Sequence, residues 1–367
     1  MQFIDLKRQY ESLRDPINQR IQAVLDHGQY VMGPEVGELE DALSQFVGVS
    51  NCITVASGTD ALLISLMALE LEPGSEVITT PFTFAATAEV IVLLGYKPVF
   101  VDIDARTCNI DTSLIESKIT PRTRAIIPVS IFGQPADMDK INSVAAKYNL
   151  YVIEDAAQSF GAEYKGKRSC GLSTIGCTSF FPSKPLGCYG DGGAIFTSDS
   201  LLAKRMREIR VHGQSSRYFH TRIGVGGRMD TLQCGIVLGK LLRFPAEVSA
   251  RQVIGERYNQ LLGGKVKSLS LVSQMPDRTS VFAQYTIITE NRDSLQGRLT
   301  QDDIPTAVHY PRPLNEQPAY EAFCCPGCTP VSFEISRSVL SIPMHPYLTS
   351  EEQDRVVAAV LKCASVD

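Results

Sequence analysis

The chain has 367 residues, of which 44% are hydrophobic, and its formal net charge is −5. A chain of this length can bury a large core, typically in one large domain with a smaller one. No block of like charges provides the electrostatic footprint of nucleic-acid or anionic-membrane binding, so a small molecule is the expected partner.

The N-terminal stretch MQFIDLKRQYESLRD is charged where a secretory signal would be apolar. No apolar run reaches the roughly 20 residues that a membrane-spanning helix needs. We therefore expect a cytoplasmic protein with no membrane association.

Between residues 51 and 199, short β-branched runs alternate with amphipathic segments. The runs predict seven strands, at 52–57, 76–82, 97–104, 124–132, 150–155, 177–181 and 193–198. This alternation predicts an α/β domain whose mostly parallel sheet is covered by helices on both faces.

Beyond residue 199 the pattern changes. It predicts a long helix near 230–262, strand-like pieces at 281–290 and 305–311, and a final helix from about 350. We therefore expect a large domain over 1–245, which includes the N-terminal helix, and a smaller C-terminal domain over 246–367.

Two turns that follow predicted strands carry candidate site residues. The first strand leads into Ser57-Gly58-Thr59-Asp60 and then a helix, and the free N–H groups of a helix start can bind phosphate. The fifth strand ends at Asp155, a carboxylate that is costly to bury unless a cation or a proton meets it. For the Ser57–Asp60 turn and for Asp155 alike, the alternative interpretation is an ordinary helix cap. In a regular strand Glu154 and Asp155 point to opposite faces, so only one of them need enter a site.

Lys184 stands between two prolines in FFPSKPLG, and four glycines, Gly187, Gly190, Gly192 and Gly193, follow it in GCYGDGG. The prolines restrict the backbone around Lys184, so the loop holds this lysine rigidly. A rigid, desolvated lysine loses its proton easily and attacks carbonyl carbons. An exposed loop lysine is the alternative.

A phosphate-binding helix start, a strand-end acid and a rigid lysine are together what pyridoxal 5'-phosphate requires: a phosphate cradle, a partner for the pyridinium nitrogen and an amine for covalent attachment. Phe84, which follows the second strand, could stack on the ring, or could belong to the core.

Ten cysteines are scattered along the chain, which suggests reduced thiols. CCPGC at 324–328 has no second cysteine pair to complete a zinc site, so we expect no metal and a loop with free thiols. The glycines of GCYGDGG do not form the GxGxxG of a dinucleotide site, which disfavours a Rossmann oxidoreductase.

From FIDLKRQY through SGTDAL, EDAAQSFGA and FFPSKPLGCYGDGGA to TAVHYP and SIPMHP, the sequence resembles the DegT/DnrJ/EryC1/StrS sugar aminotransferases. These are fold-type-I pyridoxal phosphate enzymes. The resemblance implies a large domain with a mostly parallel seven-stranded sheet, a smaller C-terminal α/β domain, and a homodimer with active sites at its interface.

The resemblance also implies roles for individual residues. Lys184 is implied as the lysine that bonds to the cofactor, Asp155 as the partner of the pyridinium nitrogen, Gln158 as a neighbour of the ring hydroxyl and Phe84 as the stacking ring. The implied phosphate contacts are Gly58, Thr59 and Ser179.

The segment SFFPSKPLGCYGDGGA is similar to the corresponding segment of one subgroup of this family. Members of that subgroup aminate UDP-2-acetamido-2-deoxy-3-oxo-glucuronate, with L-glutamate as the amino donor, for surface polysaccharides such as O-antigen. His309 and Tyr310 resemble positions that face the sugar nucleotide. Arg228 and Arg312 are candidates for binding its negative charges, with a solvated surface arginine as the alternative. Gly226 stands where many members carry an asparagine that reaches the cofactor phosphate of the neighbouring subunit.

Other functions stay open. The substrate could be another nucleotide-linked keto sugar, for example a 4-keto-6-deoxy sugar, or the chain could be a non-catalytic regulatory protein on the same fold. A sugar dehydratase of this fold would carry a histidine in place of Lys184.

Overall fold

A computed structural model describes residues 1–324 and 326–365. Its largest unit is a seven-stranded sheet in the order β1-β9-β8-β5-β4-β2-β3. The bounds are β1 Asn51–Val55, β2 Glu76–Thr79, β3 Lys97–Phe100, β4 Thr123–Ile127, β5 Tyr151–Asp155, β8 Ile175–Ser179 and β9 Gly193–Thr197. Only β9 runs antiparallel to its neighbours. The seven predicted strands correspond to these seven, so the predicted mostly parallel sheet is confirmed.

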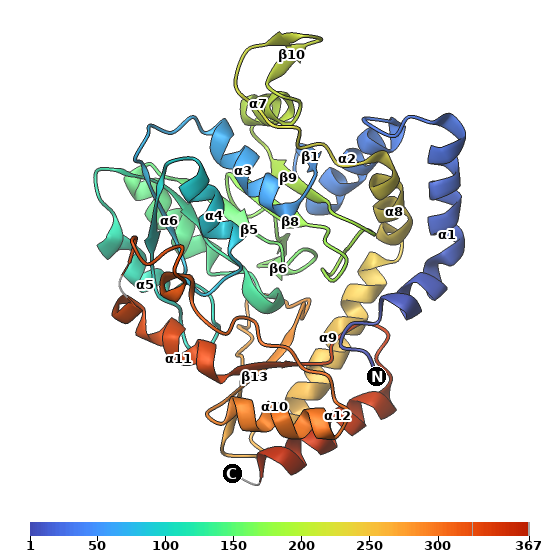
Figure 1. The fold of residues 1–367 in the computed structure, drawn as a ribbon, viewed down its shortest axis with the longest axis vertical. Coiled ribbons are helices and arrows are strands. Elements are labelled where there is room, and N and C mark those ends of the chain that lie inside the picture. Colours follow the sequence, from blue (N-terminus) through green and yellow to red (C-terminus); the bar gives the residue numbers. More distant parts are fainter. Residues whose placement is uncertain (325, 366–367) are drawn as a thin grey trace.

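Helices cover both faces of this sheet (Figure 1). One face packs under α3 Gly58–Ala68, α4 Ala86–Leu93 and α7 Ser200–Arg210. The other packs under α2 Pro34–Val47, α6 Met138–Tyr148 and α8 Thr231–Leu241, with the short helix α5 Thr112–Ile115 beside α6. Side-chain alternation along the strands accounts for both layers: in β1, Cys52 joins the core under α2 and Ile53 joins the core under α3.

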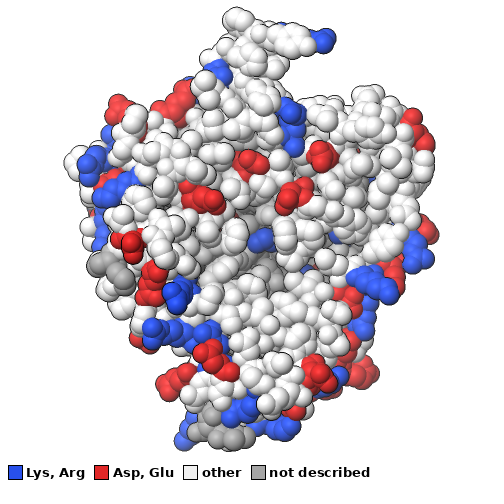
Figure 2. All heavy atoms as spheres, viewed as in Figure 1, with Lys and Arg blue, Asp and Glu red and all other residues white. Residues whose placement is uncertain are grey.

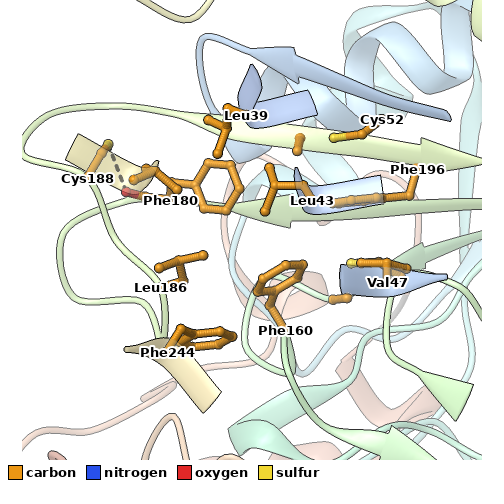
Figure 3. Packing of buried hydrophobic residues seen from close by; sticks show 14 of the residues in the cluster. Leu39, Leu43, Val47, Cys52, Phe160, Phe180, Leu186, Cys188, Phe196 and Phe244 are labelled. Atoms are coloured by element: carbon orange, nitrogen blue, oxygen red, sulfur yellow. Dashed lines mark hydrogen bonds between the residues drawn. The ribbon is translucent and has the colours of Figure 1, made fainter. Parts of the chain in front are cut away.

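Figure 3 shows the aromatic part of the core under α2. The ring of Phe160 stacks on Phe196 and Phe244, with centroid distances of 5.9 and 5.7 Å, and meets Phe180 edge-on at 6.1 Å. These offset and edge-on arrangements are the ones that aromatic pairs favour. Because Phe180 directly precedes the loop of Lys184, the core anchors one end of that loop.

The prediction of one long helix near 230–262 is wrong about continuity. The structure has two helices there, α8 and α9 Phe244–Leu262, separated at Leu242 and Arg243. Pro245, in the first turn of α9, explains the break, because proline has no N–H to donate to a carbonyl of the preceding turn. The N-terminal helix α1 Leu6–His27 packs on α8 through Leu13, Ile17 and Ile236.

The C-terminal residues form a smaller antiparallel sheet of β12 Leu269–Leu271, β13 Tyr285–Thr289 and β14 Val339–Ile342. It packs with α9, α10 Arg292–Gln301, α11 Pro330–Ser338 and α12 Ser350–Ala364. The predicted strand at 281–290 contains β13, whereas 305–311 makes only a bridge from Ala307 to Ser341. The final helix begins where it was predicted. We keep 1–245 and 246–367 as the proposed domains.

Two small antiparallel ladders complete the fold. One is β6 Glu163–Tyr164 with β7 Lys167–Arg168, and the other is the hairpin of β10 Gln214–Ser216 with β11 Phe219–His220. The hairpin extends from the body of the molecule at the top of Figure 1.

Across the residues that the structure describes, no helix is long and apolar enough to cross a membrane, and no group of His, Cys, Asp or Glu could hold a metal ion. The cysteines from Cys52 to Cys234 are buried and lie outside any disulfide. In CCPGC, Cys328 is disulfide-bonded, so the expectation of free thiols is wrong for this residue. Cys325 lies outside the described residues.

Candidate active site

The candidate site lies at the carboxyl edge of the seven-stranded sheet. The strands β1, β2, β5 and β8 run in the same direction, so the residues that follow them come to one edge, where open α/β sheets bind their ligands. Figure 2 shows the molecule hollowed near its centre, above the C-terminal part of the chain, with a basic side chain visible inside the hollow.

Gly58 and Thr59 form the first turn of α3. The Ser57 hydroxyl accepts a hydrogen bond from the Asp60 N–H at 3.0 Å and donates to the Asp60 carboxylate at 3.0 Å. As at every helix start, the N–H groups of Gly58 and Thr59 have no acceptor within the helix. Ser179 lies against this turn, because a Cβ on Gly58 would come within 2.6 Å of the Ser179 Cβ. The three predicted phosphate contacts therefore form one cluster at a helix N-terminus, which favours an anion.

Asp155 is the last residue of β5 and is buried. Its Oδ2 accepts a hydrogen bond from the Thr87 hydroxyl at 2.8 Å, and its Oδ1 accepts one from the Ala157 N–H at 3.2 Å. Burial raises the pKa of Asp155, and the two hydrogen bonds and the Lys184 charge oppose that shift. The carboxyl group is therefore held firmly in place with a pKa above its ordinary value.

Glu154 points away from the site, as the strand periodicity predicted. Its carboxylate accepts hydrogen bonds from the Ser169 hydroxyl at 2.6 Å and the Cys170 N–H at 2.9 Å. Burial raises the pKa of Glu154 to about 7. Of the two neighbouring acids, only Asp155 faces the lysine.

Lys184 lies in the loop between β8 and β9, which closes on itself. The Phe181 carbonyl accepts from the Lys184 N–H at 2.9 Å, and the Phe180 carbonyl accepts from the Cys188 N–H at 2.7 Å. Burial lowers the pKa of the Lys184 amine, while the charge of Asp155 raises it. No residue in 1–324 or 326–365 makes a hydrogen bond or ion pair with this amine. A lowered pKa increases its neutral, nucleophilic fraction.

Gln158 and Tyr310 lie next to Asp155. The Gln158 amide donates to the Tyr310 hydroxyl at 3.2 Å and accepts from the Phe132 N–H at 2.8 Å. Burial, with the nearby Asp155 charge, raises the pKa of Tyr310, so its hydroxyl keeps its proton. The Tyr310 ring centroid is 6.2 Å from that of Phe84. Phe84 is 58% exposed, so its ring is accessible to a bound group.

His309 completes the cluster. Its Nδ1 is 3.1 Å from the Ser341 hydroxyl. Burial and the charge of Lys184 lower the pKa of His309 to about 4, so the imidazole is neutral near pH 7. The structure thus brings His309 and Tyr310, predicted to face a sugar nucleotide, to the side of Lys184 and Asp155.

The two candidate arginines are placed differently. Arg228 follows Gly227, whose carbonyl accepts from the Ala56 N–H at 2.9 Å, so Arg228 lies beside the turn at Gly58. Arg312 is exposed, and the described part of the chain places no acidic or polar group against its guanidinium. Substrate binding by either arginine stays a prediction.

Thr87 and Phe132 are site residues that the sequence did not reveal. Thr87 lies in the first turn of α4 and positions Asp155. Phe132 acts through its backbone N–H, in a turn where its φ is +59°. The residue type at position 132 does not reveal that its backbone N–H serves the site. For Thr87, only a conserved spacing to Asp155 could have indicated its role.

These residues fit the cofactor that the resemblance implies. Pyridoxal phosphate needs donors for its phosphate, a carboxylate for its ring nitrogen and an amine for its aldehyde carbon. The structure provides a helix N-terminus at Gly58 and Thr59 with the Ser179 hydroxyl, the fixed Asp155 carboxylate, and the buried Lys184 amine.

Comparison with known proteins agrees with this arrangement. The model of the DegT/DnrJ/EryC1/StrS aminotransferase family matches residues 11–361. The chain is 55% identical to the UDP-2-acetamido-2-deoxy-3-oxo-D-glucuronate aminotransferase of Pseudomonas aeruginosa, over 98% of this chain and 99% of that protein.

Solved structures agree as well. A DegT DnrJ EryC1 StrS aminotransferase from Brucella abortus matches with a TM-score of 0.96 at 40% identity, covering 99% of both chains. A putative sugar aminotransferase from Streptococcus pneumoniae, solved in its pyridoxal phosphate form, matches with a TM-score of 0.90 at 25% identity over 96% of both chains. The chain therefore belongs to the DegT/DnrJ/EryC1/StrS aminotransferase family and is a pyridoxal-phosphate-dependent aminotransferase.

Proposed function

We propose that this enzyme transfers the amino group of L-glutamate to the 3-keto group of a UDP-linked sugar, UDP-2-acetamido-2-deoxy-3-oxo-D-glucuronate, in the synthesis of surface polysaccharide precursors such as O-antigen. The proposal rests on the 55% identity to the Pseudomonas aeruginosa enzyme over nearly the whole length of both chains. The cluster of Lys184, Asp155, His309 and Tyr310 supplies the groups that such a transfer needs.

Pyridoxal phosphate, when bound, supplies an electron sink that makes the hydrogen on the substrate α-carbon acidic. The Lys184 amine, whose pKa burial lowers, removes that proton as a general base and returns a proton as a general acid. The Asp155 carboxylate stabilises a proton on the ring nitrogen. Gly58, Thr59 and Ser179 bind the phosphate and so fix the cofactor for both half-reactions.

The sugar would lie against uncharged groups. His309 is neutral near pH 7 and Tyr310 keeps its proton, so both can form hydrogen bonds with sugar hydroxyl or amide groups without adding charge beside Lys184. Arg228, at the phosphate end of the site, is the candidate partner for a negative group of the substrate.

We also propose that the enzyme is a cytoplasmic homodimer with active sites at the interface. Large apolar side chains remain exposed close to the site: Tyr30 is 49% exposed, Val31 59% and Phe84 58%. Val31 bridges to Asp230, two residues from Arg228. Exposed apolar groups around a functional site are typical of an interface.

A glutamate-dependent amination assay with UDP- and dTDP-linked keto sugars tests the substrate. We expect amination of the 3-keto uronate. Amination of a 4-keto-6-deoxy sugar with the 3-keto uronate left untouched would refute the substrate while leaving the family unchanged.

Lys184→Ala, compared with Lys204→Ala at an exposed position on α7, tests the role of Lys184. We expect the first variant to be inactive and the second to match the wild type. Normal turnover by Lys184→Ala would refute the assignment.

A further inference from the structure

Lys240 on α8 is a buried cation outside the candidate site. It is 1% exposed, and its Nζ donates to the carbonyl oxygen of Gly187 at 2.7 Å and to the side-chain oxygen of Gln9 at 3.0 Å. The same nitrogen lies 4.1 Å from the ring centroid of Tyr189, within the range of a cation–π contact.

This environment is unusual for an ammonium group, because no carboxylate in the described residues lies within ion-pair distance of it. The Glu247 carboxylate instead accepts hydrogen bonds from the Gln9 amide at 3.0 Å and from the Tyr347 hydroxyl at 2.6 Å. A buried charge is costly unless fixed polar groups satisfy it. A backbone carbonyl, an amide oxygen and a ring face satisfy Lys240, and the shortest of these contacts, to the Gly187 carbonyl, ties the positions of Lys240 and Gly187 together.

Gly187 belongs to the loop that carries Lys184. A Cβ on Gly187 would come within 2.6 Å of the Pro182 carbonyl oxygen and 2.7 Å of the Phe181 carbonyl oxygen, so the two halves of the loop touch at this point. The Phe181 carbonyl is also the acceptor for the Lys184 N–H. A shift of Gly187 would therefore move the turn that holds Lys184.

We propose that Lys240 is a positioning residue for Lys184: by holding the Gly187 carbonyl, it fixes the loop 181–188 and with it the place of the Lys184 amine relative to Asp155. The inference rests on the proposed role of Lys184. It also assigns a part to the N-terminal helix, because Gln9 of α1 lies between Lys240 and Glu247 and holds both.

The test compares Lys240→Met and Lys240→Gln with a change at a second buried cation, Arg278→Met, which differs from Lys240 in also pairing with the Asp277 carboxylate at 2.7 Å. Arg278 is also a buried cation that donates to a backbone carbonyl, Pro135 at 3.0 Å, and lies over a tyrosine ring, 4.7 Å from Tyr164. It does not touch the loop 181–188. Hydrogen exchange of peptides that cover residues 181–189 is measured on the cofactor-free protein. The kcat and the KM for glutamate are measured on the enzyme loaded with pyridoxal phosphate.

In Lys240→Met we expect exchange in 181–189 to accelerate and kcat to fall about tenfold or more, since a small misplacement of a reacting group costs that much. KM for glutamate should change by less than about twofold, because the substrate contacts remain. Lys240→Gln keeps a hydrogen-bond donor and should lie between Lys240→Met and the wild type. Arg278→Met should lower the melting temperature without changing loop exchange or kcat.

Equal loss of stability in Lys240→Met and Arg278→Met, with loop exchange and kcat unchanged in both, would show that Lys240 is only a structural residue and overturn the proposal. If Lys240→Met does not fold, wild-type exchange and kcat in Lys240→Gln would overturn it equally. An active Lys184→Ala variant would instead refute the function of Lys184, whatever the Lys240 variants do.

Discussion

Asp155 and Lys184 influence each other through charge, without a direct hydrogen bond. Burial raises the pKa of the acid and lowers that of the amine, and the charge of each opposes the shift of the other. The charge of each group therefore favours the ionised form of the other, which partly offsets the cost of burying both.

Asp155→Asn removes one charge while keeping the shape of the side chain. Because the Asp155 charge raises the pKa of Lys184, this variant should lower that pKa further, and kcat should fall on the order of a hundredfold through loss of a fixed electrostatic partner. The pH dependence of Lys184 modification by a small aldehyde, followed by mass spectrometry on cofactor-free protein, measures the pKa. Glu154→Gln, on the opposite face of β5, is the control, and an equal shift in this variant would contradict the assignment.

His345 makes stability depend on pH. It is 2% exposed, and burial together with Arg251 lowers its pKa to about 4. Because the unfolded state binds the proton below about pH 6.5 and the folded state does not, stability falls as pH decreases from about 6.5 toward 4, by up to about 3 kcal/mol for this residue. Glu154, with its pKa raised to about 7, acts in the opposite direction over part of this range.

Urea unfolding at pH 7 and pH 4.5 measures this effect. His345→Gln should lose less stability between the two pH values than the wild type, and His220→Gln, at an exposed site, should behave as the wild type does. A wild-type pH dependence in His345→Gln would exclude this residue as the source.

At the scale of elements, the sequence predicted what depends on local pattern. Runs of β-branched residues predicted the seven strands, and the ends of β1 and β5 predicted where Gly58 and Asp155 lie. The pattern did not predict the break before Pro245 in a helical region, because the flanking apolar periodicity continues across it. It also could not predict that Lys240 meets Gly187, or that Thr87 meets Asp155, since these contacts depend on how separate elements pack.

The loop of Lys184 should be sensitive to Gly187 in particular. In Gly187→Ala the added Cβ would meet two backbone oxygens of the same loop, at 2.6 and 2.7 Å, so the loop must open. We expect kcat to fall about tenfold or more. Gly37→Ala on α2, where an added Cβ meets nothing within 4 Å, should keep full activity and gain up to about 1 kcal/mol of stability. Steady-state kinetics and thermal melting measure both, and a Gly187→Ala enzyme with wild-type kcat would refute the tight closure.

At the scale of the whole molecule, the hairpin of β10 and β11 projects from the body (Figure 1), and the hairpin and the segment after it carry exposed apolar side chains. Tyr218 is 78% exposed, Phe219 62% and Ile223 85%. Exposed apolar side chains on a projecting arm are unfavourable in water, and a second copy of the chain in the proposed dimer would bury them. The same segment leads into Gly226 and Arg228 beside the turn at Gly58, so pairing through it would bring two active sites to the interface.

The double variant Phe219→Glu with Ile223→Glu places charges on this arm and should convert the proposed dimer into a monomer. Val253→Glu, at a 64% exposed apolar position on α9, is the control and should remain dimeric. Size-exclusion chromatography with light scattering gives the mass, and glutamate-dependent turnover gives the activity. Because the proposed sites lie at the interface, the monomer should lose activity as well as its partner. A monomeric wild type would refute the dimer. A monomeric variant with full activity would show that each chain holds a complete active site. In that case the exposed Phe84 would contact the cofactor without any contribution from a second subunit.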